Sequence, residues 1–242
     1  HLDFAPDFVW IKSRTFNDNH NIADTVRGAT KYIFPNSNSN EFTSSTYLNR
    51  FSANGFSIGS DNSGNKIGEN FVSWNWKAGG AAVTNNNGTI ASQVSANKDS
   101  GFSIVKYTGN NTDGATVGTG LTEACNIVIV KDLTSANYWC VGGSTVGNGE
   151  NLYLNDAGQK LTRDRVKSVQ TSTFTLGSHF EVNSSNNFIA YCFHSVAGYS
   201  KIGSYGGNSN TQTIITGFKP SFVMIKTINT VSNWVIFDDK RP

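Results

Sequence analysis

Charged residues are scarce in this chain, and neither sign dominates. Asp, Glu, Lys and Arg make up 15% of the 242 residues, against about 25% in a typical soluble domain. The formal net charge is +2, and the basic residues stand singly along the sequence. Nucleic-acid-binding proteins usually concentrate basic residues on one face. The composition therefore predicts no nucleic-acid partner.

Cysteine and long hydrophobic runs are also scarce. Cys125, Cys140 and Cys192 form no Cys-x-x-Cys pair and lie in apolar segments, so we expect buried free thiols rather than a disulfide framework. No segment approaches the roughly 18 apolar residues of a membrane-spanning helix, and no signal peptide is visible. Because the chain begins with His1 and stops at Pro242, we interpret it as part of a longer polypeptide.

Polarity comes instead from Asn, Ser, Thr and Gly. The sequence contains 24 glycines and about 30 asparagines, residues that favour turns over helix interiors. Aromatic residues reach 12%, which argues against disorder. The composition predicts a folded protein with many tight loops and a neutral polar surface.

A short apolar run that ends in lysine occurs three times. The three runs are "FVWI" before Lys12, "IVIV" before Lys131 and "FVMI" before Lys226. Eight residues after each lysine the chain carries an aromatic ring, which belongs to His20, Trp139 and Trp234 respectively. The first and third copies also share an acid and a base three residues apart, which we interpret as a repeated structural ion pair; these pairs are Asp24 with Arg27 and Asp238 with Arg241.

Other blocks are duplicated as well. Gly55–Asp61 returns as Thr173–His179, Asn70–Lys77 as Asn187–His194, and Gly101–Asn110 as Gly198–Asn208. The spacing differs because of a Gly/Asn-rich insert at 78–97, which is predicted to be a loop. Such a long period indicates an array of similar supersecondary units. The predicted division is a first unit at 1–115, a second at 116–210, and the start of a third at 211–242, packed into the same sandwich.

Strand signals dominate throughout the chain. The three lysine-terminated runs are apolar on both faces and predict central strands covered on each side. The alternation in Gly101–Tyr107 and in Phe71–Trp76 predicts half-buried strands. The best helix candidate, Asn21–Ile33, is rich in β-branched residues, which disfavour a helix. The predicted fold is an all-β antiparallel β-sandwich or jelly roll of the concanavalin-like kind.

Three features could carry chemistry, but a structural interpretation is simpler for each. Ser57 lies in a formal G-x-S-x-G motif, which needs a strand–turn–helix context, whereas its surroundings predict a strand. Glu181 and Asp156 belong to no acidic motif of the kind that glycoside hydrolysis needs, and we expect both at the surface. The oxygen-rich run Asp61–Asn65 could hold calcium but departs from the EF-hand pattern and is predicted to be a turn.

Histidine, tryptophan and lysine receive structural interpretations too. The four histidines, His1, His20, His179 and His194, offer no metal-ligand spacing. Tryptophans could form a sugar-stacking platform, but we expect Trp10, Trp139 and Trp234 in the core, and Trp74 and Trp76 on one strand face. The repeated lysines predict a buried stem with a solvated head. The sequence thus assigns no catalytic, cofactor-binding or metal-binding residue, and the ligand-binding residues stay unassigned.

The repeated blocks resemble a family of phage proteins. "FAPDFVWIKSR", "FVSWNWKAGG" and "GFSIVKYTGN" are similar, in sequence and order, to a repeat family in structural proteins of tailed phages, especially marine and cyanobacterial ones. The resemblance covers nearly the whole chain. It implies a tail fibre or capsid decoration with a lectin-like β-sandwich and no catalytic residues. Cys125 stands where the repeat usually carries Pro, and in that family the pattern continues beyond the position of Pro242.

The leading hypothesis is a non-enzymatic phage virion structural protein, exposed on the extracellular particle. Its expected partners are other virion proteins and identical subunits, with host surface glycans as a further contact. No cofactor, nucleic acid or membrane insertion is expected. Two alternatives stay open: a secreted carbohydrate-binding module or polysaccharide-active enzyme, and a bacterial surface adhesin or filament subunit.

Overall fold

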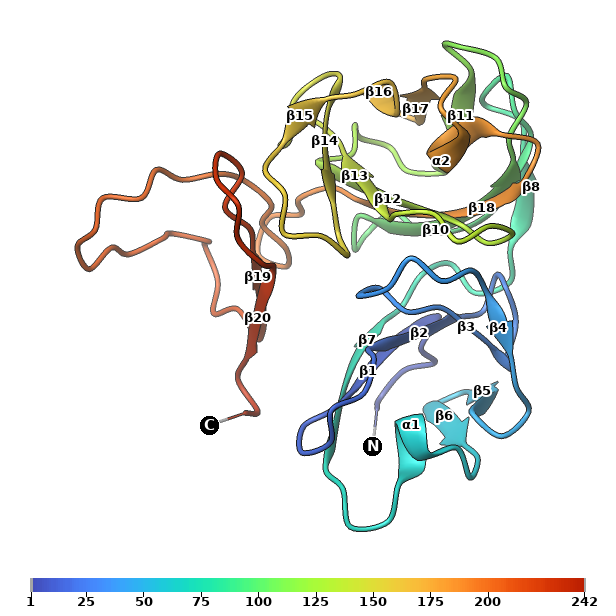
Figure 1. Ribbon diagram of the computed structural model, residues 1–242, viewed down its shortest axis with the longest axis vertical. Helices are drawn as coiled ribbons and strands as arrows, with labels where there is room; N and C mark the ends of the chain where they lie inside the picture. The colour runs from blue at the N-terminus through green and yellow to red at the C-terminus, as the bar shows by residue number, and fades with distance from the viewer. Residues whose placement is uncertain (1, 242) are drawn as a thin grey trace.

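The strands stack in four layers in the computed structural model, which describes residues 2–241 (Figure 1). From one end to the other these are a β-hairpin, a three-stranded sheet, an eight-stranded sheet and a second three-stranded sheet. Each pair of neighbouring layers encloses a hydrophobic core. The prediction of an all-β fold with antiparallel sheets is confirmed. No helix among residues 2–241 is long and apolar enough to cross a bilayer.

The first two layers are formed by the N-terminal part of the chain. Strand β1 pairs with β2 on one side and β7 on the other, both antiparallel. The hairpin β5–β6 covers this sheet from below in Figure 1. The elements are β1 (Phe8–Ser13), β2 (Asn21–Asp24), β3 (Lys31–Tyr32), β4 (Phe42–Thr43), β5 (Leu48–Ser52), β6 (Gly55–Ile58), the single-turn helix α1 (Asn62–Asn65) and β7 (Phe71–Trp76).

The other two layers follow. The eight-stranded sheet has the order β15-β14-β13-β12-β18-β10-β9-β8, and the sheet β11-β17-β16 covers its outer face. The elements are β8 (Val83–Asn85), β9 (Ser92–Asn97), β10 (Phe102–Thr108), β11 (Thr116–Gly118), β12 (Ile127–Asp132), β13 (Cys140–Gly142), β14 (Glu150–Tyr153), β15 (Leu161–Thr162), β16 (Val166–Val169), β17 (Thr173–Leu176), α2 (Phe180–Asn183) and β18 (Asn187–Phe193).

Two of the apolar runs that end in lysine form strands with a hydrophobic core on each face. In β1, Phe8 and Trp10 face the core shared with the eight-stranded sheet, while Val9 and Ile11 face the hairpin β5–β6. Successive side chains of a strand point to opposite faces, so a strand between two cores must be apolar at every position. The same holds for β12 (Ile127–Asp132). The prediction of central, doubly covered strands is confirmed for these two copies.

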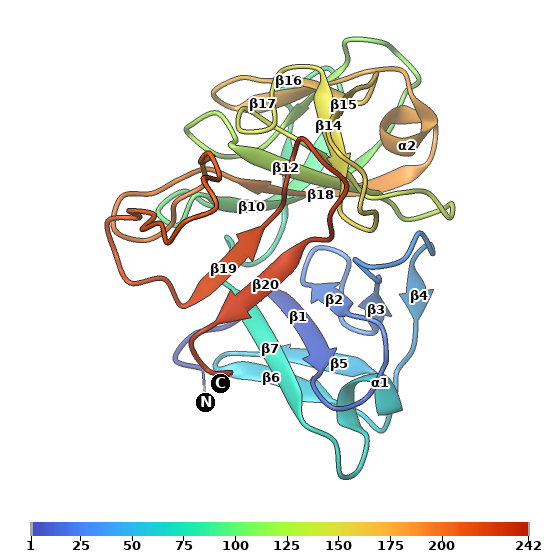
Figure 2. The same ribbon diagram turned by 60° about the vertical axis from the view of Figure 1, so that its left-hand side comes forward.

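The third copy lies in a hairpin that leaves the layers. Strands β19 (Phe222–Ile225) and β20 (Val235–Asp238) pair only with each other among the described residues. Figure 2 shows this hairpin lying across the side of the stacked sheets. A long strand-free segment at 201–221 precedes it. All four residues of β19 are half-buried, in contrast to Phe8–Ile11 of β1, which are buried.

Four local predictions were wrong. Gly101–Tyr107 was predicted to be half-buried, but β10 is covered on both faces, because Phe102 and Ile104 pack into one core and Val105 and Tyr107 into the other. The insert at 78–97 is not all loop, since it supplies β8 and β9, which extend the large sheet. Gly198–Asn208, taken as the copy of Gly101–Asn110, forms no strand. The run Asp61–Asn65 is not a plain turn, because Asn62–Asn65 forms the single-turn helix α1 and the carboxylate of Asp61, its N-cap, accepts from the Ser63 amide.

The first repeat (residues 8–76) and the second repeat (127–193) have the same strand pairing. In the first the order is β2-β1-β7, and in the second the corresponding strands run β13-β12-β18. Each repeat then has a bulged hairpin, β5–β6 and β16–β17 respectively, followed by a four-residue helix. In the third repeat (222–241) the hairpin β19–β20 corresponds to β1–β2. The predicted boundaries at 115 and 210 stay a prediction, although β8–β10 join the sheet of the second repeat.

Candidate functional sites: a buried charge cluster and an open groove

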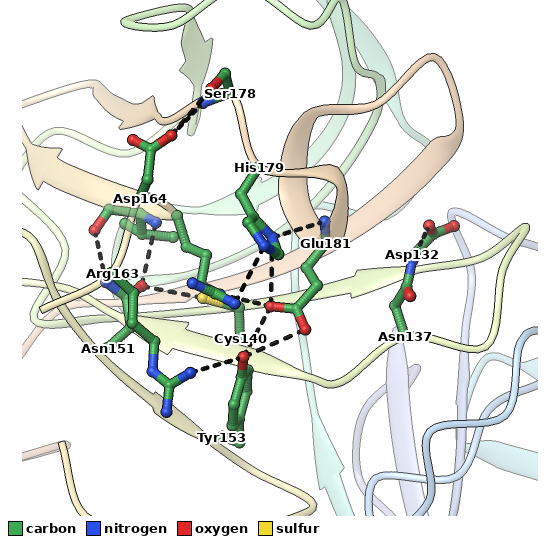
Figure 3. Close-up of polar contacts among 12 residues, drawn as sticks. Asp132, Asn137, Cys140, Asn151, Tyr153, Arg163, Asp164, Ser178, His179 and Glu181 are labelled. Atoms are coloured by element: carbon green, nitrogen blue, oxygen red, sulfur yellow. Dashed lines mark hydrogen bonds and ion pairs between the residues drawn. The ribbon is translucent and has the colours of Figure 1, made fainter. Parts of the chain in front are cut away.

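A group of charged side chains lies in the second repeat, around Glu181 (Figure 3). The Glu181 carboxylate accepts a hydrogen bond from the Tyr153 hydroxyl at 2.9 Å and another from Arg165 Nε. Arg163 donates to the Tyr153 hydroxyl at 3.1 Å, and the ring of His179 accepts from the Glu181 amide at 3.3 Å. Glu181 was predicted at the surface, but it is 4% exposed. The prediction failed because Arg165 gives the buried carboxylate a partner.

This cluster links Tyr153 of β14 to the start of α2. Burial, aided by the negative charge of Glu181, raises the pKa of Tyr153 to about 12. Burial and the nearby Arg165 lower the pKa of His179 below its ordinary value. A general acid or base works best with a pKa near the working pH, and Tyr153 does not meet that condition at neutral pH. The His179 ring, which accepts from the Glu181 amide, caps the first turn of α2.

The three cysteines lie in the core. All three are buried and free, which confirms the prediction. Burial raises the pKa of Cys140 to about 12, and its thiol donates to Asn151 Oδ1 at 3.0 Å. Since the thiolate is the reactive form, Cys140 is a core side chain.

The other residues considered for chemistry have structural contacts. Ser57 lies in β6, as predicted, and its hydroxyl accepts from Arg50 at 3.3 Å. Asp156 is exposed, also as predicted. His194 is buried, and its ring Nδ1 lies 3.0 Å from the Ser195 carbonyl. Within residues 2–241, no three His, Cys, Asp or Glu side chains are placed to hold a metal ion.

The tryptophans divide between core and interface. Trp10, Trp74 and Trp139 are buried, while Trp76 and Trp234 are half-buried. The indole of Trp139 donates to the carbonyls of Phe34 and Ser37, and that of Trp234 donates to the carbonyl of Tyr153. The prediction of core positions is confirmed for Trp10 and Trp139. Trp234 instead joins the third repeat to the second.

The repeated lysines join neighbouring repeats in the same way. Lys131 Nζ donates to Asn38 O of the first repeat at 3.1 Å, and Lys226 Nζ donates to Ala157 O of the second at 3.1 Å. Each also donates to a carbonyl six residues later in its own repeat: Lys131 to that of Asn137, and Lys226 to that of Ser232. The prediction of a solvated lysine head was wrong for Lys131, which is fully buried, because the neighbouring repeat supplies carbonyls in place of water.

The acid–base pairs are confirmed as repeated ion pairs. Arg27 Nε donates to Asp24, and Arg241 Nε donates to Asp238. Each arginine also donates to a backbone carbonyl of the preceding strand, that of Ile22 or Ile236, at 2.9 Å. Burial alone would lower the pKa of Arg27, but its buried partner Asp24 raises that pKa. Burial raises and hydrogen bonding lowers the pKa of Asp238, and the hydrogen bonds prevail.

A groove of about 760 Å³ lies between the first repeat and the C-terminal hairpin. Its walls include Lys12, His20 and Trp74 on one side and Trp234 and Arg241 on the other. His20 Nδ1 accepts from the Trp10 indole at 3.0 Å. Burial, with Lys12 and Arg241 nearby, lowers the pKa of His20 to about 4. No local sequence pattern predicts this groove, since it depends on how distant repeats meet.

These observations define an all-β protein whose repeats are joined by the same polar contacts. A family model for a domain of unknown function, DUF7483, matches residues 1–242. The chain therefore belongs to the DUF7483 family. No curated protein and no solved structure matches it significantly.

Proposed function

We propose that this protein is a non-enzymatic structural component of a tailed-phage virion, exposed on the particle as a tail fibre or a capsid decoration. The observation that carries the proposal is the reuse of one strand pattern as scaffold. The lysine contacts that join the repeats are the same at two places, and a scaffold of this kind supports function through its loops. The resemblance of the repeated blocks to phage structural proteins supplies the virion setting.

The chemistry of the charged residues supports the non-enzymatic part of the proposal. The Glu181 carboxylate is held by Arg165 and Tyr153, and the pKa of Tyr153 is raised to about 12, far from neutrality. The polar loops rich in Asn, Ser and Gly suit hydrogen bonding to glycans on a host surface. Their low charge suits a protein that stays soluble without strong electrostatic fields.

The direct test is to purify particles of the phage that encodes this chain, identify their proteins by mass spectrometry, and label intact particles with an antiserum. The proposal expects the chain in the particles and label on their surface; serum absorbed with the purified protein is the control. Its presence in infected cells but absence from particles contradicts the proposal. A glycan array with a reducing-sugar assay tests the rest, since release of reducing ends overturns the non-enzymatic part.

A further inference from the structure

The three repeats meet pairwise, so each touches both of the others. The first and second repeats meet through Lys131, and the second and third meet through Lys226. The third and first also meet, because the Trp74 indole donates to Asp238 at 3.2 Å. A head-to-tail contact that returns to its starting point forms a closed ring.

The contact that closes this ring reproduces one seen between the first two repeats. Tyr191 of the second repeat donates to Asp24 at 2.7 Å, beside Arg27. In the same way Trp74 of the first repeat donates to Asp238, and Arg241 lies over its ring at 5.2 Å. Tyr191 pairs with Ile129 in the second repeat as Trp74 pairs with Trp10 in the first, so the two aromatic donors hold equivalent positions.

The aromatic packing repeats as well. Phe8 meets the ring of Tyr191 edge-on at 4.8 Å, and Phe222 meets the ring of Trp74 edge-on at 5.7 Å. Phe8 and Phe222 open the equivalent strands β1 and β19. The contact between the third and first repeats therefore has the aromatic donor and the Phe packing found between the first and second, but it lacks the contact from the lysine.

Two surfaces lack the contacts that their equivalents make elsewhere. Lys12 and His20 hold the positions of Lys131 and Trp139. They line the groove instead of donating to backbone carbonyls of another repeat. The Nδ1 of His20 accepts from Trp10, so the neutral ring carries its proton on Nε2. His20 thus presents a donor, as the indoles of Trp139 and Trp234 do.

The second open surface is the outer face of the C-terminal hairpin. Val235 is 43% exposed and Phe237 is 56% exposed. Their equivalents in β2, Asn21 and Ala23, are 0% and 1% exposed. Leu48, the first residue of β5, and the preceding Tyr47 belong to the core that covers Ala23.

We propose that the three repeats form a closed ring with pseudo-threefold symmetry, and that the groove beside Lys12 and the outer face of β20 are one docking surface. Its occupant is a segment equivalent to 28–76, which completes the third repeat beside β20. The loop of that segment gives carbonyls to Lys12 and His20, as Asn38 and Phe34 do for Lys131 and Trp139. Its hairpin covers Val235 and Phe237.

The test extends the chain. Residues 1–241 are followed by a second copy of residues 28–76, because Arg241 is equivalent to Arg27. Amine labelling of Lys12, read by mass spectrometry, measures whether the groove is filled. Hydrogen exchange of the β20 amides measures whether the hairpin is covered. The control carries Tyr47→Ser and Leu48→Ser in the appended copy only, which removes the side chains expected to reach β20.

The extension is expected to slow labelling of Lys12 and exchange in β20 by at least about tenfold relative to the chain without it, with a smaller effect in the control. Unchanged labelling and exchange, or equal protection in the control, overturn the proposal. A dimer of the unextended chain that dissociates on Phe237→Lys overturns the named occupant, since a second copy then covers the hairpin. These outcomes are independent of whether the protein is found in a virion.

Discussion

Lys131 and Lys12 hold the same position in two repeats, yet their surroundings differ completely. Lys131 is fully buried and donates to carbonyls at 2.7 and 3.1 Å. Lys12 is half-buried and makes one long hydrogen bond, 3.4 Å to Phe16 O. The strand and the lysine are alike, so the difference comes from the neighbour. A repeat of this protein determines the position of its lysine, and the adjacent repeat determines what that lysine does.

The buried ion pair gives the largest expected effect in this comparison. Arg27→Met leaves Asp24 charged and buried, and we expect a loss of about 3 to 5 kcal/mol in the free energy of unfolding. Arg241→Met also leaves a carboxylate with little exposure, since the Asp238 side chain is 4% exposed, but the arginine side chain is 28% exposed, so we expect a smaller loss of about 1 to 2 kcal/mol. Urea denaturation of both variants measures the difference. Equal losses would show that the two interfaces are equally buried.

The lysines give the next effect. Lys131→Met removes two charged hydrogen bonds and leaves the Asn38 and Asn137 carbonyls without that donor, so we expect a loss of about 2 to 4 kcal/mol. The matched variant Lys12→Met should change the free energy of unfolding by less than about 0.5 kcal/mol. Denaturant midpoints at pH 7 provide the measurement. A large effect at Lys12 would mean that its present contacts already stabilise the chain.

His20 adds a dependence on acid pH. Its pKa is about 4 in the folded protein, against 6.5 ordinarily, so the unfolded chain binds a proton first as the pH falls. The stability contributed by the neutral ring is present above pH 6.5 and lost between pH 6.5 and 4. At 1.36 kcal/mol per pKa unit, discounted for partial exposure, this amounts to about 2 to 3 kcal/mol. His20→Phe should lose less stability across that range; parallel pH profiles would contradict the assignment.

Lys131 gives a smaller effect at alkaline pH, with a slope of the same sign as that of His20. Burial lowers its pKa to about 8 from 10.5, so between those values the unfolded chain binds more protons and stability rises with pH. From pH 8 to 9.5 the wild type should gain about 1 to 2 kcal/mol relative to Lys131→Met. This window lies below the titration of the buried tyrosines, whose pKa values are raised. A constant difference between the two proteins would contradict a neutralised buried lysine.

The sequence predicted the strands and the ion pair within a single repeat, but it did not predict the contacts between repeats. The two-sided runs before Lys12 and Lys131 correctly predicted covered central strands, because alternation is a property of one strand. The pairing of Asp24 with Arg27 also followed from local spacing. By contrast the burial of Lys131, the bond from Tyr191 to Asp24 and the groove beside His20 depend on contacts between residues about 100 or more positions apart. No local pattern specifies them.

Glu181 shows the same limit inside one repeat. A lone acid with no spaced motif was predicted at the surface, but Arg165 and Tyr153 bury it. The sequence signal that could have located it was the pair of arginines Arg163 and Arg165 just before β16. That signal becomes informative only when β16 and α2 are known to be neighbours.

The central claim is that the repeats share one core through equivalent contacts, and calorimetric unfolding of the chain tests it most directly. The account predicts that the first and second repeats melt in a single transition, and that Arg27→Met moves the whole of that transition to lower temperature. Two separate transitions, with only one of them displaced by the substitution, would contradict it.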